Sequence, residues 1–397
     1  MKKAILVFVL VFGFVFLSCT GYCPESNFRV EPVDGGASVR VIEYTGENWE
    51  VKIPPRIRNL PVTHIGERAF ENSSLISVTI PSSVIHIGAE AFASNELTSL
   101  IIHDNITYIG AGAFSNNQLA NVTIPNSIAT IEHRAFYRNQ LTIVTIPNSV
   151  SNIGHGAFAN NRLTSVAIPN SVSNIGHGAF ANNQLTNVII PNGVTTIEHR
   201  TFYRNQLTSV AIPNSVSNIG HGAFANNQLL GITIPSSVNT IGYAAFANNQ
   251  LISVTIPNGV MRIEFGAFRN NQLTNIIIPS SVTSISHSYS LWPLGQEHGG
   301  AFENNQLISV NIPSHVSHIG SRTFYRNQLT SVTIPNNVRY IGANAFANNR
   351  LTNVTIPDGV SNIRENAFAN NQLTRVSIGW HTGNWGAFDS RVVVTRR

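Results

Sequence analysis

The sequence predicts a mainly β solenoid of about fourteen 22-residue coils with an atypical cap at each end. The first observation is a phenylalanine that recurs every 22 residues, with one longer step of 34 residues. A period in the twenties is typical of a solenoid, in which each repeat forms one coil stacked on the last. The second observation is that each repeat carries a short alternating apolar segment ending in Ile-Pro. The recurring residues are Phe70, Phe92, Phe114, Phe136, Phe158, Phe180, Phe202, Phe224, Phe246, Phe268, Phe302, Phe324, Phe346 and Phe368.

One repeat, which begins at Leu141, explains the expected coil. Residues 141–146 end in an apolar–polar–apolar alternation, which is the pattern of a half-buried strand. Pro147 ends this strand because proline has no backbone N–H to donate to a ladder. Residues 150–153 form a second short extended piece, and Phe158 returns to the core in a single helical or 3₁₀ turn. Stacked in register, the inward residues form continuous apolar columns.

A column of asparagines accompanies the phenylalanines, one in each repeat, from Asn95 to Asn371. A buried amide at a turn can satisfy backbone groups that the turn leaves unpaired. Because every coil needs the same hydrogen bonds, we interpret this column as structural rather than functional.

The repeat pattern L-x-x-V-x-I-P-x-S-V-x-x-I-G-x-x-A-F resembles the leucine-rich repeats of the BspA-like, or Treponema pallidum, type over residues 50–378. Members often carry Cys after A-F-x-x and have 23 residues per repeat, whereas this chain has Asn at that position and 22 residues. The resemblance implies a right-handed leucine-rich-repeat solenoid on a bacterial cell envelope. It also implies adhesion to host matrix proteins or to other bacteria.

Residues 1–18 have the features of a signal peptide, with Lys2 and Lys3 followed by an apolar stretch and a small residue. The sequence up to Cys19 resembles a bacterial lipobox, which implies a lipid on Cys19. The alternative is an ordinary signal peptide, after which Cys19 and Cys23 could form a tight disulfide. In the lipoprotein interpretation, residues 19–37 are the lipid attachment and tether, and Cys23 is a free thiol within it.

The remaining boundaries follow from where the period begins and fails. Residues 38–70 are expected to form an N-terminal capping coil, residues 71–378 the solenoid, and residues 379–397 a C-terminal cap. Caps are expected because an uncovered terminal coil exposes both core and strand edges. We expect Trp380 and Trp385 to cover the last coil.

The step of 34 residues places a twelve-residue insertion at residues 286–297. It is either an aromatic binding loop or a loop folded onto a neighbouring coil, and its candidate contact residues are Tyr289, Leu291 and Trp292. The repeat also has a 66-residue superperiod, because residues 132–138 and 198–204 are nearly identical.

The strand positions that face away from the core form a largely uncharged surface, which we expect to contact ligands. Ile101, Ala167, Ile189, Ala211 and Ile277 interrupt the polar residues there. The candidate contact residues on this surface are Thr123, Thr145, Thr233, Thr255 and Thr333.

Composition argues against several function classes. Charged residues are only 11% of the chain and the formal net charge is +5, of which Lys2 and Lys3 lie in the signal segment. This small excess is no basis for nucleic-acid binding. No nucleotide-binding, metalloprotease or serine-hydrolase motif occurs in a credible context, so we expect no enzyme and no cofactor.

One column of titratable residues occurs within the repeats, at a single position in five successive coils. Such a column could bind a divalent metal or respond to pH, but Tyr243 and Phe265 continue it. This interchange favours a copied structural residue and leaves a metal site as the weaker hypothesis. The members are His133, His155, His177, His199 and His221.

Together these observations predict an envelope-anchored lipoprotein that binds extracellular or surface proteins of a host or of other bacteria. The chain would lie at the outer membrane or the cell surface and touch the membrane only through its N-terminal lipid. The alternative is a passive structural or antigenically variable surface protein without a dedicated ligand.

Overall fold

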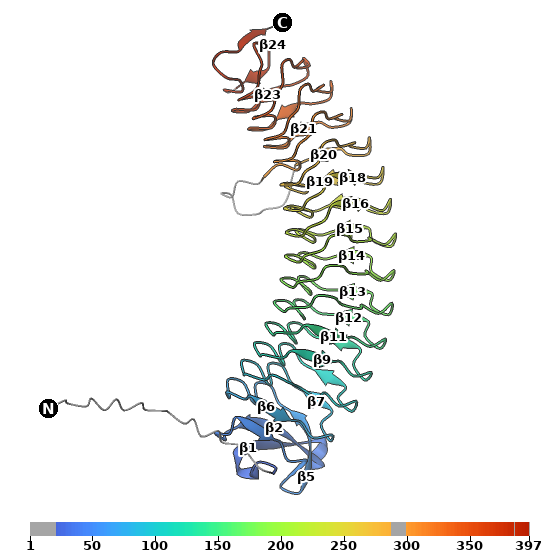
Figure 1. Ribbon diagram of the computed structural model, residues 1–397, viewed down its shortest axis with the longest axis vertical. Helices are drawn as coiled ribbons and strands as arrows, with labels where there is room; N and C mark the ends of the chain where they lie inside the picture. The colour runs from blue at the N-terminus through green and yellow to red at the C-terminus, as the bar shows by residue number, and fades with distance from the viewer. Residues whose placement is uncertain (1–20, 287–298, 385, 397) are drawn as a thin grey trace, which may run out of the picture.

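The computed structural model describes residues 21–286, 299–384 and 386–396, which form one curved stack of coils (Figure 1). The blue N-terminal end and the red C-terminal end lie at opposite ends of the stack. This arrangement confirms the predicted mainly β solenoid, and it contains almost no helix. The signal peptide and Cys19 lie outside the described residues.

Three parallel ladders run along the stack, although not every coil contributes a strand to the first. The first joins strands at the first extended segment, as in β9 (Asn121–Thr123) and β11 (Ile143–Thr145), which pair in parallel register. In both strands the central valine is buried and the flanking residues are exposed, as the alternation predicted. The other strands of this ladder are β6 (Ser77–Thr79), β16 (Gly231–Thr233), β18 (Ser253–Thr255) and β24 (Arg375–Ile378).

The second ladder is built from two-residue strands, each ending in a buried isoleucine except in the last coil. Its longest sheet has nine strands, from β14 to β25. The members are β7 (His86–Ile87), β8 (Tyr108–Ile109), β10 (Thr130–Ile131), β12 (Asn152–Ile153), β13 (Asn174–Ile175), β14 (Thr196–Ile197), β15 (Asn218–Ile219), β17 (Thr240–Ile241), β19 (Arg262–Ile263), β20 (Ser284–Ile285), β21 (His318–Ile319), β22 (Tyr340–Ile341), β23 (Asn362–Ile363) and β25 (Gly383–Asn384).

The third ladder runs along the turns that carry the phenylalanines, and we call this side of the stack the turn edge. The backbone N–H groups of Gly156, Phe158 and Asn160 each donate to a carbonyl of the next coil. Gly156 and Asn160 have φ of 61° and 59°, in the left-handed region that glycine and asparagine tolerate best. The expected helical or 3₁₀ turn is therefore wrong, because alternating left-handed residues prevent a helix from propagating.

The phenylalanines form one stacked column through the core. Every ring from Phe70 to Phe346 is fully buried, and successive ring centroids lie 4.9–5.9 Å apart. Phe302 stacks on Phe268 at 5.6 Å and 5°, so the insertion leaves the column unbroken.

The asparagine column works as predicted. Asn183 illustrates it: its Nδ2 donates to the carbonyls of Phe158 (2.9 Å) and Phe180 (3.1 Å), and its Oδ1 accepts from the N–H of Leu163 (3.0 Å). One buried side chain thus ties three successive segments of backbone together. The same pattern recurs from Asn95 to Asn371.

The N-terminal cap begins earlier than the sequence indicated. Strand β1 (Phe28–Val33) lies inside the expected tether and pairs antiparallel with β2 (Ser38–Tyr44). Phe28 packs on Tyr44 at 5.5 Å, and Tyr44 stacks on Phe70 at 5.4 Å, so these two rings close the column. The other elements of the cap are η1 (Glu25–Asn27), η2 (Asp34–Gly36), β3 (Glu50–Lys52), β4 (Arg56–Ile57) and β5 (Leu60–Ile65).

Cys23 also belongs to this cap and not to a tether. Its side chain is 2% exposed, and its backbone N–H donates to the carbonyl of Lys52 at 3.0 Å. Cys23 is disulfide-bonded. The expected free thiol is therefore not what the structure contains.

The C-terminal cap differs from the expectation in its closing residue. Phe388 stacks on Phe368 at 5.3 Å and 9°, and β26 (Val393–Arg396) pairs with β24. Trp380 is 68% exposed and does not cover the last coil, while Trp385 lies outside the described residues. Phe388 takes this role because it follows the core alanine Ala387, as every column phenylalanine follows Ala or Thr.

Candidate binding surfaces

The first ladder places all five predicted threonines on one exposed surface, which we call the strand face. Thr123 aligns with Thr145, and Thr233 aligns with Thr255, in parallel register. Thr333 forms a parallel bridge to the residue one coil on. The five side chains are exposed, and the backbone ladder beneath them consists of separate short sheets and single bridges.

Large aliphatic side chains are exposed on the same face. Ile189 is 80% exposed and Ile277 is 78% exposed, at the positions that threonine holds in other coils. Ile143 lies two residues before Thr145 and is 65% exposed. Exposed aliphatic groups that recur on one face are more typical of an interaction surface than of an isolated surface residue. The sequence analysis noted Ile189 and Ile277 but missed Ile143, whose position alternates outward in the same strand.

A shallow hollow of about 490 Å³ interrupts the strand face in the coils around β16 and β18. Ala211 has only a methyl group and Gly231 has no side chain, and this leaves the depression between their larger neighbours. Thr233 and Thr255 line it together with serines, so its surface is mixed polar and apolar.

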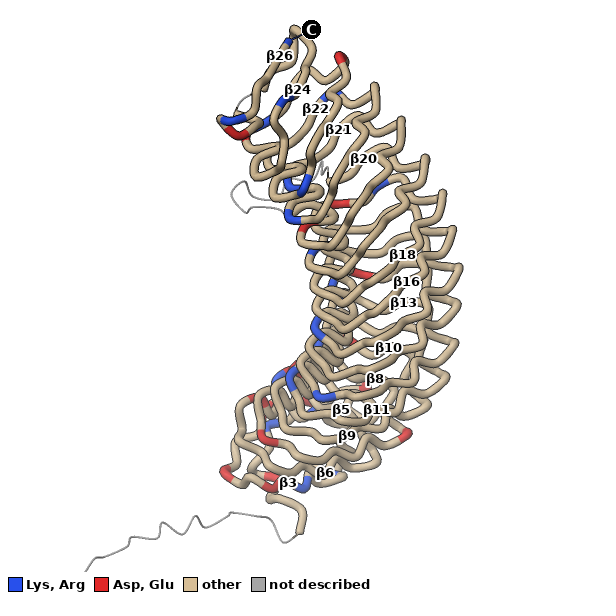
Figure 2. Tube along the Cα trace, turned by 45° about the horizontal axis from the view of Figure 1, so that its top comes forward, with Lys and Arg blue, Asp and Glu red and all other residues tan. Residues whose placement is uncertain are grey.

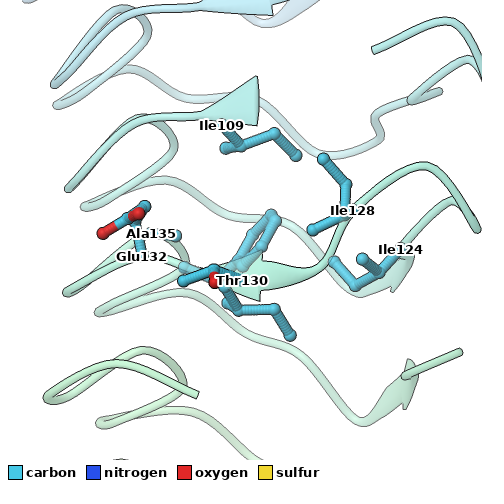
Figure 3. Close-up of a pocket in the computed structure, with 8 residues that line it drawn as sticks. Ile109, Ile124, Ile128, Thr130, Glu132 and Ala135 are labelled. Carbon is cyan, nitrogen blue, oxygen red and sulfur yellow. The ribbon is translucent and has the colours of Figure 1, made fainter. Parts of the chain in front are cut away.

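The interior is closely packed between the coils around Phe136. Figure 3 shows Ile109, Ile124 and Ile128 pointing towards one another between coils, with Glu132 at the outer side. The volume left between these side chains is about 0 Å³ for a water molecule.

The insertion leaves the solenoid at the turn edge. Ser286 keeps the hydrogen bond of its coil, from its N–H to the carbonyl of Ile263 at 2.9 Å, so the extra residues follow it. Its hydroxyl accepts from the N–H of Ala301 at 2.7 Å, which brings the two ends of the insertion together. Tyr289, Leu291 and Trp292 lie outside the described residues, so their role stays a prediction.

A buried carboxylate lies beside the insertion. Glu303 is fully buried, accepts from the guanidinium of Arg322 at 2.7 Å, and lies 3.9 Å from Arg269. It also accepts from the N–H of Gly300 at 3.0 Å. The adjacent coils carry Arg269 and Tyr325 at this position, and the repeat pattern leaves it variable, so the sequence did not single out Glu303.

The five histidines form a stacked column on the turn edge, with ring centroids 4.4–4.9 Å apart. The Nδ1 atoms of His133, His155 and His199 accept from the backbone N–H of the next histidine at 2.9, 2.8 and 3.0 Å. A neutral imidazole that accepts at Nδ1 carries its proton on Nε2. Nε2 then has no lone pair to offer to a metal unless the backbone bond breaks.

One group within this column brings three ligand types together. His177, Glu198 and His199 each offer an atom within 4.8 Å of the others, and His177 Nε2 lies 3.6 Å from the Glu198 carboxylate. Because His199 already accepts a backbone hydrogen bond at Nδ1, this group has two ligands without a competing bond. A structural zinc site needs four. The geometry therefore disfavours a metal here.

Burial lowers the pKa of His155 and His199 below the usual value for imidazole, and the adjacent histidines lower it further. Burial likewise lowers the pKa of His64 and His86, which stack at 5.2 Å in the N-terminal part of the stack. The lowered pKa values favour neutral rings at pH 7 for these four histidines.

Arginines and tyrosines recur beside the histidines. Figure 2 shows the basic residues of the central coils gathered along the inner edge of the curve. The guanidinium groups of Arg134 and Arg138 lie over the ring of Tyr137, at 5.6 and 5.2 Å from its centroid. In the sequence these residues served only as evidence of duplication. The Arg-x-x-Tyr-Arg pattern nevertheless indicated that two arginines lie near one tyrosine.

None of the helices in the described part of the chain could cross a bilayer. The BspA type leucine rich repeat region, in six copies, matches residues 63–186, 173–290 and 298–389. No curated protein matches the chain.

Three solved structures are similar to the chain. A leucine-rich repeat protein from Bacteroides ovatus has 18% identity and a TM-score of 0.55, over 94% of this chain and 98% of that one. The pneumococcal vaccine antigen PcpA has 17% identity and a TM-score of 0.57, over 93% and 96%. The Treponema pallidum leucine-rich repeat protein has 28% identity and a TM-score of 0.35, over 52% and 89%.

The likeness to the first two structures shows a shared fold. Together with the matched repeats, the register of the three ladders and the unbroken phenylalanine column, these comparisons show that the chain belongs to the family of BspA-type leucine-rich repeat proteins.

Proposed function

We propose that this protein is an envelope-anchored lipoprotein whose strand face binds proteins of a host or of other bacteria. The observation that carries the proposal is the row of exposed isoleucines set among threonines on one uncharged face. Such a face suits broad contact of modest affinity with an extended protein, strengthened when several coils engage at once. Fourteen coils at about 5 Å each make a surface roughly 70 Å long.

The anchor in this proposal is a lipid on Cys19. A thioether on Cys19 and a disulfide to Cys23 need the same sulfur atom, so the two states exclude each other. Mass spectrometry of the mature protein from its native membrane distinguishes them: acyl groups on an N-terminal cysteine support the anchor. An unmodified Cys19 in a disulfide would contradict it.

Binding is tested with the purified protein and a panel of immobilised extracellular matrix proteins. We expect Ile189→Ser and Ile277→Ser together to weaken binding at least about tenfold, because each removes exposed aliphatic contact area. Ile85→Ser and Met261→Ser form the matched control, since both residues are exposed aliphatics outside the strand face. Absence of binding to every protein of the panel, or equal binding by both variants, would contradict the proposal.

The 66-residue superperiod favours a second candidate function, a passive structural or antigenically variable surface protein. An array that tolerates block duplication can serve as a spacer whose length matters more than any one coil. Deletion of one 66-residue block distinguishes a spacer from a binding protein. A shortened spacer remains exposed on the cell surface and keeps its other properties. A binding face that includes the deleted coils loses affinity. Protease treatment of intact cells measures the exposure in both cases.

A further inference from the structure

Three turns of the stack carry a cluster of two arginines over a tyrosine, at Tyr137, Tyr203 and Tyr325. At the third turn Arg322 is already paired with Glu303, so we call only the first two the arginine–tyrosine turns. In the first, Arg134 and Arg138 lie over Tyr137; in the second, Arg200 and Arg204 lie over Tyr203 at the same 5.6 and 5.2 Å. They lie on the turn edge, three coils apart, or about 15 Å at the usual spacing of parallel strands. Contact with the ring holds each guanidinium in one place.

The backbone of these arginines is unfavourable for their residue type. Arg134, Arg138, Arg200 and Arg204 have φ between 51° and 56°, in the left-handed region. The two coils between these turns use glycine and asparagine at the equivalent positions, the residues for which this conformation is least unfavourable. Arg68, Glu90 and Ala244 adopt the same conformation in other coils, so it belongs to the turn and is not by itself a sign of function.

The arginines also have no acidic partner. Within the described residues, none of these four side chains forms an ion pair or a hydrogen bond, so their N–H donors remain available. Arg162, between the two turns, is exposed as well. Glu198, one of the two nearby carboxylates, lies against His177. The result is a local excess of positive charge on this part of the turn edge.

From this geometry we propose that the turn edge between Arg134 and Arg204 binds a linear sulfated polysaccharide. A planar guanidinium pairs with two oxygens of a sulfate group through parallel hydrogen bonds. Between the two turns the partly exposed amides of Asn160 and Asn182 offer donors and acceptors that match sugar hydroxyls. A chain with spaced anionic groups and hydroxyls between them fits this alternation of charge and amide.

Nucleic acid fits the same surface less well. Proteins that bind single strands usually stack bases on aromatic rings. Here guanidinium groups already lie over the rings of Tyr137 and Tyr203, which obstructs stacking of bases on them. The polysaccharide site and the strand face consist of different residues. A negative result for one of the two proposals therefore leaves the other unaffected.

The test is a titration of the full-length protein with a heparin oligosaccharide at an ionic strength of about 0.15 M, where weak surface attraction is screened. The variant replaces the four arginines by the residues of the neighbouring coil: Arg134→Gly, Arg138→Asn, Arg200→Gly and Arg204→Asn. Because those residues suit the left-handed backbone, the stack should be as resistant to urea as the original. We expect binding at least about tenfold weaker.

A charge-matched variant controls for net charge. Lys52→Gln, Arg56→Gln, Arg58→Asn and Arg375→Gln remove four exposed positive charges from other surfaces, and binding should stay unchanged. De-sulfated heparin should not bind. The proposal is overturned if the original protein does not bind heparin, if both variants lose binding equally, or if single-stranded DNA of equal length binds more tightly than heparin.

Discussion

Replacing Asn183 by alanine tests whether the asparagine column holds the coils together. The substitution removes the only hydrogen-bond acceptor of the Leu163 N–H, which is buried. The carbonyls of Phe158 and Phe180 each lose one donor but keep a second, from Asn161 and from the asparagine of the next coil. The damage is therefore one orphaned N–H and two weakened carbonyls.

These losses set the expected magnitude. An unsatisfied buried N–H costs about 1–3 kcal/mol, and each shared hydrogen bond to a carbonyl contributes roughly 0.5–1.5 kcal/mol. We expect Asn183→Ala to lower the free energy of unfolding by about 2–6 kcal/mol. Asn182→Gly is the matched control, because Asn182 is partly exposed and its left-handed φ of 55° suits glycine. Its effect should stay within about 0.5 kcal/mol.

Urea unfolding followed by circular dichroism measures the global change. Hydrogen exchange at the Leu163 amide measures the local one, which is needed because a repeat array can unfold in parts. Exchange at Leu163 should accelerate in Asn183→Ala and remain slow in Asn182→Gly. A loss below about 1 kcal/mol, or an unchanged Leu163 amide, would refute the view that this side chain replaces a missing backbone acceptor.

Four further outcomes are expected. Phe180→Ala should cost about 3–5 kcal/mol in urea unfolding because it empties a fully buried slot in the ring column, whereas Phe180→Leu should cost much less. Glu303→Ala should cost about 3–5 kcal/mol because it leaves two arginines without their buried carboxylate, and thermal unfolding would detect it. Deletion of residues 287–298 should leave the melting temperature nearly unchanged, because Ser286 joined to Gly299 restores a 22-residue coil. Stability should fall as the pH drops below about 6.5, since the lowered pKa values of His155 and His199 mean that the unfolded chain binds more protons there; a flat urea midpoint from pH 7 to 5 would contradict this.

The acid sensitivity has a structural cause beyond charge repulsion. Protonation converts Nδ1 of His155 from acceptor to donor, and the N–H of His177 then loses its partner. His155→Asn tests this point because its amide oxygen can still accept at low pH. If that variant loses as much stability on acidification as the original, the backbone bond is not the cause.

The sequence by itself determined the architecture of the stack. The 22-residue spacing of Phe158 and Phe180 required one coil per repeat, and the alternation around Val144 placed Thr145 outside. The amide of Asn161 was predictable as a buried partner for backbone groups. These features could be predicted because each coil has copies of itself as neighbours, so a local pattern also states the tertiary contacts.

Only the tertiary structure showed how the ends of the stack are closed and how side chains of neighbouring coils are oriented. Phe28 and Tyr44 close one end of the column, and Phe388 closes the other in place of Trp380, because an end has a neighbour on one side only. Only the fold showed that His155 accepts a hydrogen bond from the next coil. Likewise, only the fold showed that Arg134 and Arg138 lie over one ring, because both results depend on side-chain direction rather than on spacing along the chain.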